Sequence, residues 1–249
     1  MARWPKRKAG AASPRLPAFG GIDSVAPMSD RREELRTPHP PASAEFGHVV
    51  PGGPAHRYPP SGPVDVRKFT VGRYDNNVYV LASGGQALIV DGAAEPARIV
   101  SEAEGLDIVG IVQTHGHHDH VGALHALVEM LDVPVLAHPG DPMPVAAEVL
   151  RDGQRLVVGS AVIEVLHTPG HTPGSVCFYV EGFLVSGDTL FPGGPGNTRG
   201  DRTDFDRIME SLDRLFRLPD ETRVLPGHGL DTTLARERPY LEVWRARGW

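Results

Sequence analysis

The segment Thr114–His120, with the sequence Thr-His-Gly-His-His-Asp-His, constrains the fold of this chain more than any other feature. It directly follows an apolar stretch that predicts a buried β-strand. Residues two apart in extended chain project to the same side, so His115 and His117 can hold one metal ion together. Asp119 and His120 begin the next helix and point elsewhere, towards a second ion. The segment therefore predicts a site for two metal ions at the end of a strand.

Three further segments have a similar arrangement, in which a short apolar strand is followed by a histidine or an aspartate. The predicted strands cover residues 162–166, 183–186 and 223–225, and the side chains that follow them are His171, Asp188 and His228. Each of these segments alone is a weak signal. Because all four clusters follow apolar strands, they can meet along one edge of a sheet assembly.

These side chains predict a particular metal chemistry. Imidazole and carboxylate ligands suit zinc, iron and manganese without any thiolate. Three histidines for one ion, two histidines and one aspartate for the other, and a carboxylate between them leave room for a shared hydroxide. A metal ion lowers the pKa of bound water from about 15.7 to about 7, which makes the water a nucleophile near neutral pH. We expect two divalent ions, zinc first, with iron and manganese as alternatives.

From about residue 65 the sequence alternates between predicted strands and helices, which indicates an α/β sandwich. One helix is predicted over residues 119–131. A second, over residues 204–218, has a clear apolar stripe, and Thr203 is its expected N-cap.

Residues 1–63 differ in composition from the rest of the chain. They are rich in proline, glycine, alanine and arginine and show no sustained apolar periodicity. We expect them to form a mostly disordered leader with an irregular lead-in, and residues 64–249 to form the catalytic domain. Met28 is an alternative start of the native protein, which would make residues 1–27 an artefact of the gene model.

Charge and composition restrict the class of function. Residues 1–37 carry eight Lys or Arg and four Asp or Glu, a net charge of +4, which leaves 17 against 27, or −10, for the rest. An acidic body argues against a nucleic-acid binder. No apolar run approaches the roughly 18 residues of a membrane span. Cys177 is the single cysteine, so an internal disulfide is excluded, and a cytoplasmic location is expected.

Four motifs together resemble one known family. They are Thr-His-Gly-His-His-Asp-His, His-Thr-Pro-Gly-His-Thr-Pro-Gly-Ser, Ser-Gly-Asp-Thr-Leu-Phe and Pro-Gly-His-Gly, in this order. They resemble the metallo-β-lactamase superfamily, and within it the glyoxalase II-like branch, over about residues 65–249. The resemblance implies a four-layer αββα sandwich with the site at one edge of its two sheets.

The resemblance also implies a role for each candidate residue. The first metal would be held by His115, His117 and His171. The second would be held by Asp119, His120 and His228, with Asp188 bridging both, and Asp119 is also expected to act in catalysis. Asp91, at the end of a strand, would support the site.

The expected reaction is hydrolysis of a thioester, as in hydroxyacylglutathione hydrolases, with a small-molecule substrate and neither nucleic acid nor membrane as partner. Asp188 stands where the commonest class of β-lactamases has cysteine, which argues against antibiotic hydrolysis. Only about 20 residues follow His228, where glyoxalase II enzymes carry a helical domain for glutathione, so the thiol carrier stays open. Persulfide dioxygenases, which resemble the same branch and bind one iron through residues matching His115, His171 and Asp188, are one alternative. Lactone hydrolysis is another.

Overall fold

The computed structural model describes residues 47–60 and 62–248. The part of the predicted leader before residue 47, including the alternative start at Met28, lies outside these residues. The chain divides into two units, Met1–Leu35 and Arg36–Trp249, and the described residues belong to the second. Along the described part of the chain, no helix is long and apolar enough to cross a membrane.

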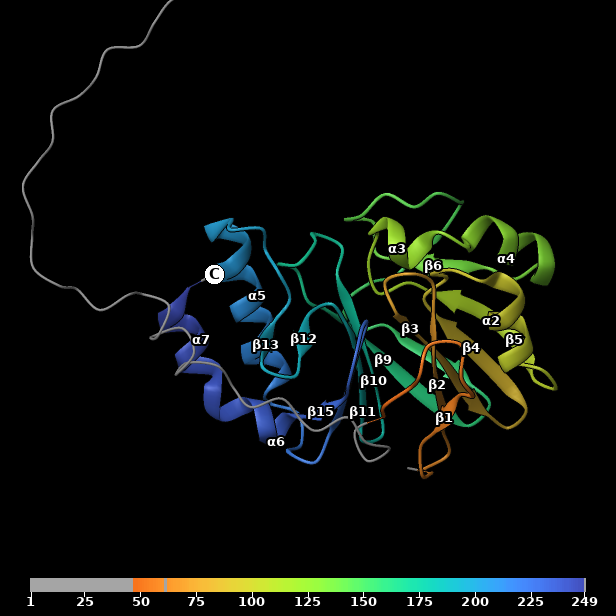
Figure 1. The fold of residues 1–249 in the computed structure, drawn as a ribbon, viewed down its shortest axis with the longest axis horizontal. Helices are drawn as coiled ribbons and strands as arrows, with labels where there is room; N and C mark the ends of the chain where they lie inside the picture. Colours follow the sequence, from red (N-terminus) through yellow and green to blue (C-terminus); the bar gives the residue numbers. More distant parts are fainter. Residues whose placement is uncertain (1–46, 61, 249) are drawn as a thin grey trace, which may run out of the picture. The chain divides into compact units, whose positions relative to one another are not determined.

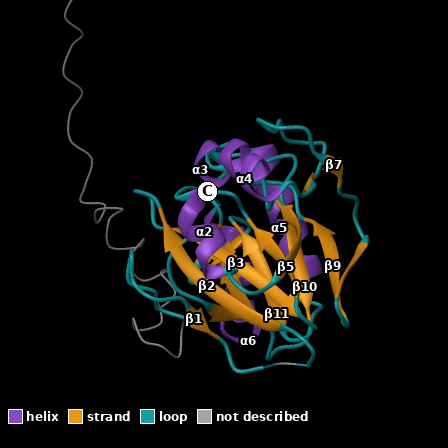
Figure 2. Ribbon diagram, turned by 90° about the vertical axis from the view of Figure 1, so that its right-hand side faces the viewer, coloured by secondary structure: helices purple, strands orange, loops and turns teal. Residues whose placement is uncertain are grey.

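Two mixed β-sheets form the centre of the described unit (Figures 1 and 2). In the first sheet the strands follow one another in chain order, antiparallel from β1 to β4 and parallel from β4 to β7. Its strands are β1 (His56–Arg57), β2 (Asp65–Val71), β3 (Asn76–Ser83), β4 (Gln86–Val90), β5 (Asp107–Val112), β6 (Val135–Ala137) and β7 (Glu148–Val149).

The second sheet has the order β15-β14-β11-β10-β9-β8, with β11 and β14 parallel and the other neighbours antiparallel. Its strands are β8 (Arg155–Val158), β9 (Ala161–His167), β10 (Val176–Val180), β11 (Phe183–Gly187), β14 (Arg223–Pro226) and β15 (Thr232–Thr233). A separate hairpin joins β12 (Leu190–Phe191) to β13 (Gly194–Pro195).

Helices cover the outer face of each sheet. On the first sheet lie α2 (Pro96–Glu102), α3 (His118–Val121) and α4 (Leu124–Leu131). Beside the second lie α5 (Arg202–Leu215), α6 (Leu234–Glu237), the 3-10 helix η2 (Arg238–Tyr240) and α7 (Leu241–Arg247). Figure 1 shows these two sets of helices on opposite sides of the strands.

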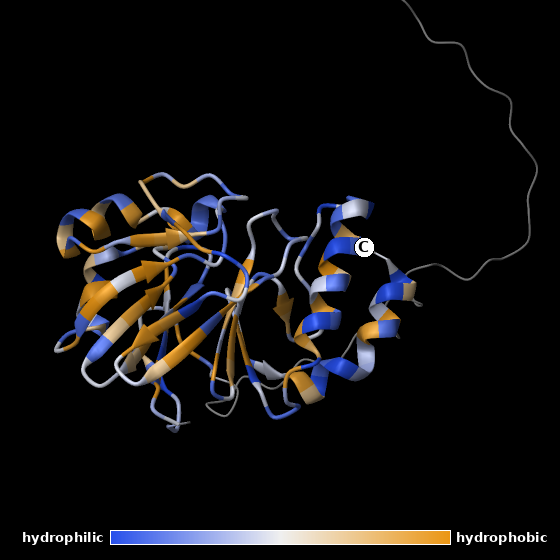
Figure 3. Cartoon of the chain, turned by 180° about the vertical axis from the view of Figure 1, so that it is seen from behind, coloured by the Kyte–Doolittle hydropathy of each residue, from blue (hydrophilic) through white to orange (hydrophobic). Residues whose placement is uncertain are grey.

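Alternation along the strands explains why this arrangement forms. In β3, Tyr79 and Leu81 face the core between the sheets, whereas Val78 and Val80 face the core under α2 and α4. Successive strand residues point to opposite faces, so a strand that is apolar throughout must be covered on both. Figure 3 shows the apolar colour concentrated on the strands and on the inner sides of the helices. The αββα sandwich predicted from the sequence is confirmed.

Two predicted details of the helices are wrong. The helix expected over residues 119–131 is two helices, α3 and α4, because the amide of Ala123 donates to the carbonyl of Gly92, 2.8 Å away, outside any helix. The N-cap of α5 is Asp201, whose Oδ1 accepts from the amide of Asp204 at 3.0 Å. Thr203 lies one residue inside the first turn of α5.

The lead-in packs on the sandwich. Strand β1 pairs with β2, and Tyr58, which is 3 % exposed, packs against Phe183 of the second sheet. Both precede residue 64, where the catalytic domain was predicted to start. These contacts lie in the part of the chain that was predicted to form an irregular lead-in.

Candidate metal centre

The candidate ligands lie at one end of the two sheets. They are in the loops that follow β5, β9, β11 and β14, except for Asp119 and His120, which lie in α3. The amide of Val176 donates to the carbonyl of Thr114 at 2.8 Å, and the amide of Asn77 donates to the carbonyl of Gly227 at 2.7 Å. These two bonds each link one sheet to the other at this end. The loops that carry the ligands are thus fixed against each other by main-chain hydrogen bonds.

Three histidines converge in the first ligand group. Nδ1 of His117 lies 3.0 Å from Nε2 of His115 and 2.9 Å from Nε2 of His171. Two nitrogens bound to the same zinc ion at about 2.05 Å would be about 3.3 Å apart in tetrahedral geometry and about 2.9 Å apart at a right angle. The observed spacing therefore fits a shared ion.

The second ligand group combines two histidines with a carboxylate. Nε2 of His120 lies 3.2 Å from Nε2 of His228, and Oδ2 of Asp119 lies 3.5 Å from the same atom of His228. The side-chain Nδ2 of Asn76 donates to Oδ2 of Asp119 at 2.9 Å and orients this carboxylate. The three ligand atoms of each group lie within 4.8 Å of one another.

Asp188 faces both groups. Its Oδ2 lies 3.5 Å from Nε2 of His171, and its Oδ1 lies 3.6 Å from Nε2 of His120. Oδ1 is buried and accepts no hydrogen bond within the described part of the chain. A buried carboxylate oxygen without a donor is costly unless a cation is bound to it, so the donor set fits a pair of divalent ions.

The nitrogens that face away from the centre determine the tautomers. Nδ1 of His171 lies 2.9 Å from the carbonyl of Asn197, and Nδ1 of His228 lies 2.9 Å from the carbonyl of Tyr74. A carbonyl only accepts, so each Nδ1 carries the proton and each Nε2 is free to bind a metal ion. His120 is held in the same way, with Nδ1 2.8 Å from Oδ2 of Asp91. Such outer contacts orient metal ligands in proteins generally.

The environment shifts the pKa values of these groups in different directions. Burial lowers the pKa of His115, of His117 and of His171, which keeps these imidazoles neutral. Burial also opposes the charged form of His120, but the hydrogen bond and charge of Asp91 raise its pKa to about 9. For Asp119, burial raises the pKa, but the hydrogen bond from Asn76 and the neighbouring imidazoles outweigh it, and the pKa is lowered.

Close packing at the centre requires glycine at two loop positions. A Cβ at Gly227 would lie 2.2 Å from Oδ1 of Asp188 and 2.8 Å from Cε1 of His120. Gly187 has a φ of +48°, and a Cβ there would lie 2.6 Å from Cβ of Thr114. Glycine in Ser-Gly-Asp therefore lets that loop pack against Thr114, and glycine in Pro-Gly-His lets the other loop pack against Asp188 and His120.

Two groups of residues support the ligand loops without any motif that could have identified them. Asp141 accepts hydrogen bonds from the amides of Gly116 and Gly174, each at 2.8 Å, and from Oγ1 of Thr172 at 2.6 Å. It therefore joins the loop of His115 and His117 to the loop of His171.

The second supporting group is a buried ion pair below the His228 loop. Nζ of Lys68 donates to Oδ1 of Asp231 and to the carbonyl of Gly229, each at 2.7 Å, and the hydroxyl of Tyr58 donates to Oδ2 of Asp231 at 2.6 Å. Lys68 and Asp231 are both fully buried. Their contacts fix the chain directly after His228.

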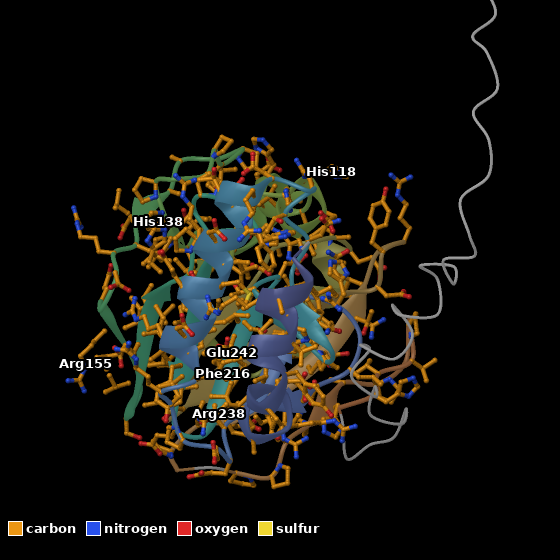
Figure 4. The ribbon with its side chains drawn as sticks, turned by 90° about the vertical axis from the view of Figure 1, so that its left-hand side faces the viewer. His118, His138, Arg155, Phe216, Arg238 and Glu242 are labelled. Carbon is orange, nitrogen blue, oxygen red and sulfur yellow. The ribbon has the colours of Figure 1, made fainter. Side chains whose placement is uncertain are left out.

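One histidine of the segment Thr114–His120 lies outside both ligand groups. His118, labelled in Figure 4, is exposed at the start of α3 and belongs to neither ligand group among the described residues. On the other side of the centre, Nη2 of Arg199 lies 2.9 Å from Nε2 of His117. Sequence reasoning placed all seven candidate ligands in one region, and the structure brings those seven together.

A four-layer sandwich with histidine and aspartate groups at one end of its sheets defines a metallo-hydrolase type of protein. A family model for the metallo-β-lactamase superfamily matches residues 71–228, and the chain belongs to this superfamily. The resemblance drawn from the four motifs is thereby confirmed.

Individual relatives agree with this assignment. A hydroxyacylglutathione hydrolase of Anaeromyxobacter dehalogenans is 41 % identical over 62 % of this chain and 61 % of that enzyme. The crystal structure of TTHA1623 in a di-iron-bound form is 37 % identical, with a TM-score of 0.61 over 68 % of this chain and 95 % of that one. ETHE1 from Myxococcus xanthus is 30 % identical, with a TM-score of 0.64 over 71 % of this chain and 82 % of that one.

Proposed function

We propose that this chain is a metal-dependent hydrolase of thioesters, similar in reaction to hydroxyacylglutathione hydrolases. The observation that carries the proposal is the meeting of two three-residue ligand groups with a carboxylate that faces both. The ligands would be His115, His117 and His171 for one ion, Asp119, His120 and His228 for the other, and Asp188 for both. Divalent ions there, zinc by first expectation, supply Lewis acidity, which polarises a carbonyl group and lowers the pKa of water to about 7.

The protein's own groups then orient and assist the reaction. The side-chain amide of Asn76 orients Asp119, whose lowered pKa keeps the carboxylate ionised at neutral pH, so it can bind a metal ion and hold the attacking water by a hydrogen bond. His115 and His120 are almost fully buried, at 2 % and 0 % exposure, so bulk water does not compete for their ring nitrogens. Asp91 contacts Nδ1 of His120 and so turns Nε2 of this ring towards the centre.

Thioesters are favoured by the relatives. The hydroxyacylglutathione hydrolase of A. dehalogenans shares 41 % of its residues with this chain in the matched region, but that region spans 61 % of the enzyme. The proposal therefore names the thioester bond and leaves the thiol of the substrate open. The division into a leader of residues 1–63 and a catalytic domain of residues 64–249, and the cytoplasmic location, stay predictions.

Persulfide oxidation at a single iron is the second candidate. The three residues that the family resemblance assigns to such an iron, His115, His171 and Asp188, lie together here, with Nε2 of His171 3.5 Å from Oδ2 of Asp188. The similarity to ETHE1 of M. xanthus is compatible with this reading. Lactone hydrolysis would use the same ligands as thioester hydrolysis and differs in substrate.

Metal analysis beside a substrate panel separates these functions. Protein purified without added metal is analysed by mass spectrometry for metals and tested on S-lactoylglutathione, acetyl thioesters of several thiols, a lactone and glutathione persulfide. We expect two metal ions per chain and turnover of thioesters. Bound metal without turnover of any thioester would contradict the proposal. One iron per chain with oxygen uptake on the persulfide would establish the second candidate instead.

Variants of the motif test the ligand assignment. We expect His117→Ala and His120→Ala each to lose at least one metal ion per chain. His118→Ala, an imidazole of the same segment outside both ligand groups, is the matched control and should retain both ions. Equal metal content in all three variants would exclude this assignment.

A further inference from the structure

A pocket adjoins the second ligand group, and the proposed metal site gives no role to this pocket. Its volume is about 400 Å³, within the range of about 300–1,000 Å³ that small-molecule sites occupy. It lies between the turn that joins β2 to β3, the entrance to α2, and the helices α3 and α4. Figure 1 shows these three helices on the same side of the first sheet.

Seven of the thirteen residues in the wall are small and apolar. They come from all three sides of the pocket and are Gly72, Ala93, Ala94, Pro96, Gly122, Ala123 and Ala126. The turn closes tightly against the entrance of α2, since a Cβ at Gly72 would lie 3.0 Å from Cβ of Ala94. Short side chains on every side leave the space that a longer apolar group of a ligand can fill.

The pocket opens directly onto the metal centre. Asp119 and Asn76 form part of its wall, and Asn76 donates to Oδ2 of Asp119. A second hollow of about 420 Å³ shares Tyr74, His118 and Asp119 with the pocket and also reaches His228. A substrate whose reacting carbonyl lies at the centre can therefore extend one of its arms into the pocket.

The charged groups of the turn are engaged with their neighbours. Nη2 of Arg73 donates to the hydroxyl of Tyr74 at 2.7 Å, and its guanidinium carbon lies 4.7 Å from the centre of the Tyr74 ring. Oε1 of Glu95 accepts from the amide of Gly72 at 2.8 Å. With Glu95 and Asp119 both in its wall, the pocket is a poor site for a carboxylate. The guanidinium of Arg199 lies across the centre, beside His117.

We propose that this pocket receives the acyl group of the thioester and selects apolar acyl groups of several carbons. The proposal rests on the proposed thioester hydrolysis and adds the class of substrate. A lactoyl or acetyl group would leave most of the pocket unfilled. Each methylene group that leaves water on binding increases affinity about fourfold, so longer acyl chains gain stepwise until the pocket is full.

A series of thioesters of one thiol tests the proposal. We would measure kcat/KM of the metal-loaded, full-length protein on acetyl, butanoyl, hexanoyl and octanoyl N-acetylcysteamine. The expected result is a rise of at least tenfold from acetyl to hexanoyl, because four methylenes are added. A value that is constant or falls along the series would overturn the proposal while leaving thioester hydrolysis established.

A substitution in the wall locates the effect. Ala126 is half-buried on α4, and Ala126→Leu places a branched side chain in the pocket; leucine is also a good helix former. We expect at least a tenfold loss in kcat/KM for octanoyl and less than a twofold change for acetyl. The matched control is Ala97→Leu, an exposed position of α2 outside the pocket wall, which should leave the series unchanged. Equal losses of kcat/KM for the octanoyl and acetyl thioesters would show that the acyl chain binds outside this pocket.

Binding of carboxylates separates this proposal from the proposed function. Calorimetric titration of the metal-loaded protein with octanoate and with acetate needs no turnover. We expect octanoate to bind at least tenfold more tightly, and Ala126→Leu to remove the difference. If octanoate shows this preference but no thioester is hydrolysed, the reaction is wrong and the pocket stands as an apolar site. Equal affinities for octanoate and acetate would exclude the pocket as an acyl site whatever the enzyme hydrolyses.

Discussion

Nδ1 of His120 lies 2.8 Å from Oδ2 of Asp91, so a buried carboxylate holds the imidazole with its other nitrogen turned towards the candidate metal centre. Asp91 also accepts from the amide and from Oγ1 of Thr114, at 2.7 and 2.8 Å. It therefore orients both a ligand and the start of the segment that carries three others.

The first prediction concerns this carboxylate. We expect Asp91→Asn to lower metal affinity about 10- to 100-fold, as the loss of such outer contacts does elsewhere. In Asp91 one oxygen accepts from the amide of Thr114 and the other accepts from Thr114 Oγ1 and His120. Asparagine has a single oxygen, so its NH2 group must face one of these two sets of donors, and the contact that orients His120 is weakened or lost. Asparagine tolerates the positive φ of 68° at this position, so the backbone is retained.

Competition with a chelator measures the affinity. The exposed carboxylate of Asp107, at the start of β5, provides the control, and Asp107→Asn should bind metal like the unchanged protein. An unaltered affinity in Asp91→Asn would mean that His120 is oriented by other contacts.

The second prediction concerns Asp141, which joins the loop of His115 and His117 to the loop of His171. Asp141→Ala leaves the amides of Gly116 and Gly174 and the hydroxyl of Thr172 without their acceptor. An unsatisfied buried donor costs about 1–3 kcal/mol, so we expect the free energy of unfolding to fall by about 3 kcal/mol or more.

Denaturant unfolding with and without a chelator checks this. If Asp141 holds the ligand loops in place, the variant should also gain less stability from added zinc than the unchanged protein does. A variant that is as stable as the unchanged protein would show that water satisfies these donors, and the bridging role would be lost.

The convergence of the candidate ligands could be predicted from the sequence because each of their segments follows a short apolar strand, and the ends of neighbouring strands meet in space. The supporting residues could not. Asp141 accepts hydrogen bonds from Gly116 and Thr172, which are 25 and 31 residues away in the sequence. Lys68 contacts Asp231 across 163 residues. Such pairings depend on the packing of the two sheets, which no local pattern records.

The helix bounds that were predicted wrongly also depend on specific hydrogen bonds of the fold. Residues 119–131 have the periodicity of one helix, but the bond from Ala123 to Gly92 turns the chain between α3 and α4. For α5, both Asp201 and Thr203 are good N-caps, and the side-chain bond to the amide of Asp204 selects the aspartate. The proline-rich composition likewise gave no sign of β1 or of Tyr58, which are held by pairing with β2 and by the hydrogen bond to Asp231.

The third prediction concerns the buried pair of Lys68 and Asp231. Lys68→Met leaves the buried carboxylate of Asp231 with the more distant Arg223, whose Nη1 is 3.7 Å from Oδ2, as its cation, and we expect the free energy of unfolding to fall by about 3 kcal/mol. The double variant Lys68→Met with Asp231→Asn removes the poorly compensated charge, so it should be more stable than Lys68→Met alone.

Denaturant unfolding of both variants measures this difference. Arg155→Met is the control for loss of a cation at an exposed position, since Arg155 lies on the edge strand β8 and at the periphery in Figure 4. A double variant less stable than Lys68→Met would show that the asparagine loses more in hydrogen bonds than it gains in charge.

The fourth prediction concerns Cys177, which is completely buried in β10 with Thr168 Oγ1 3.3 Å from its Sγ. Burial raises the pKa of this thiol to about 11, although the hydrogen bonds from Thr168 and Thr189 act in the opposite direction. Only the thiolate reacts with alkylating reagents, and at pH 8 a thiol with this pKa is ionised in about one molecule in a thousand. The thiolate fraction rises tenfold for each unit of pH towards 11, while burial still excludes the reagent.

We therefore expect iodoacetamide to leave Cys177 unmodified at pH 8 in the folded protein and to alkylate it fully in concentrated guanidinium chloride, as followed by intact mass. Rapid modification of the folded protein at pH 8 would mean that β10 opens to solvent, which its position between two cores does not allow.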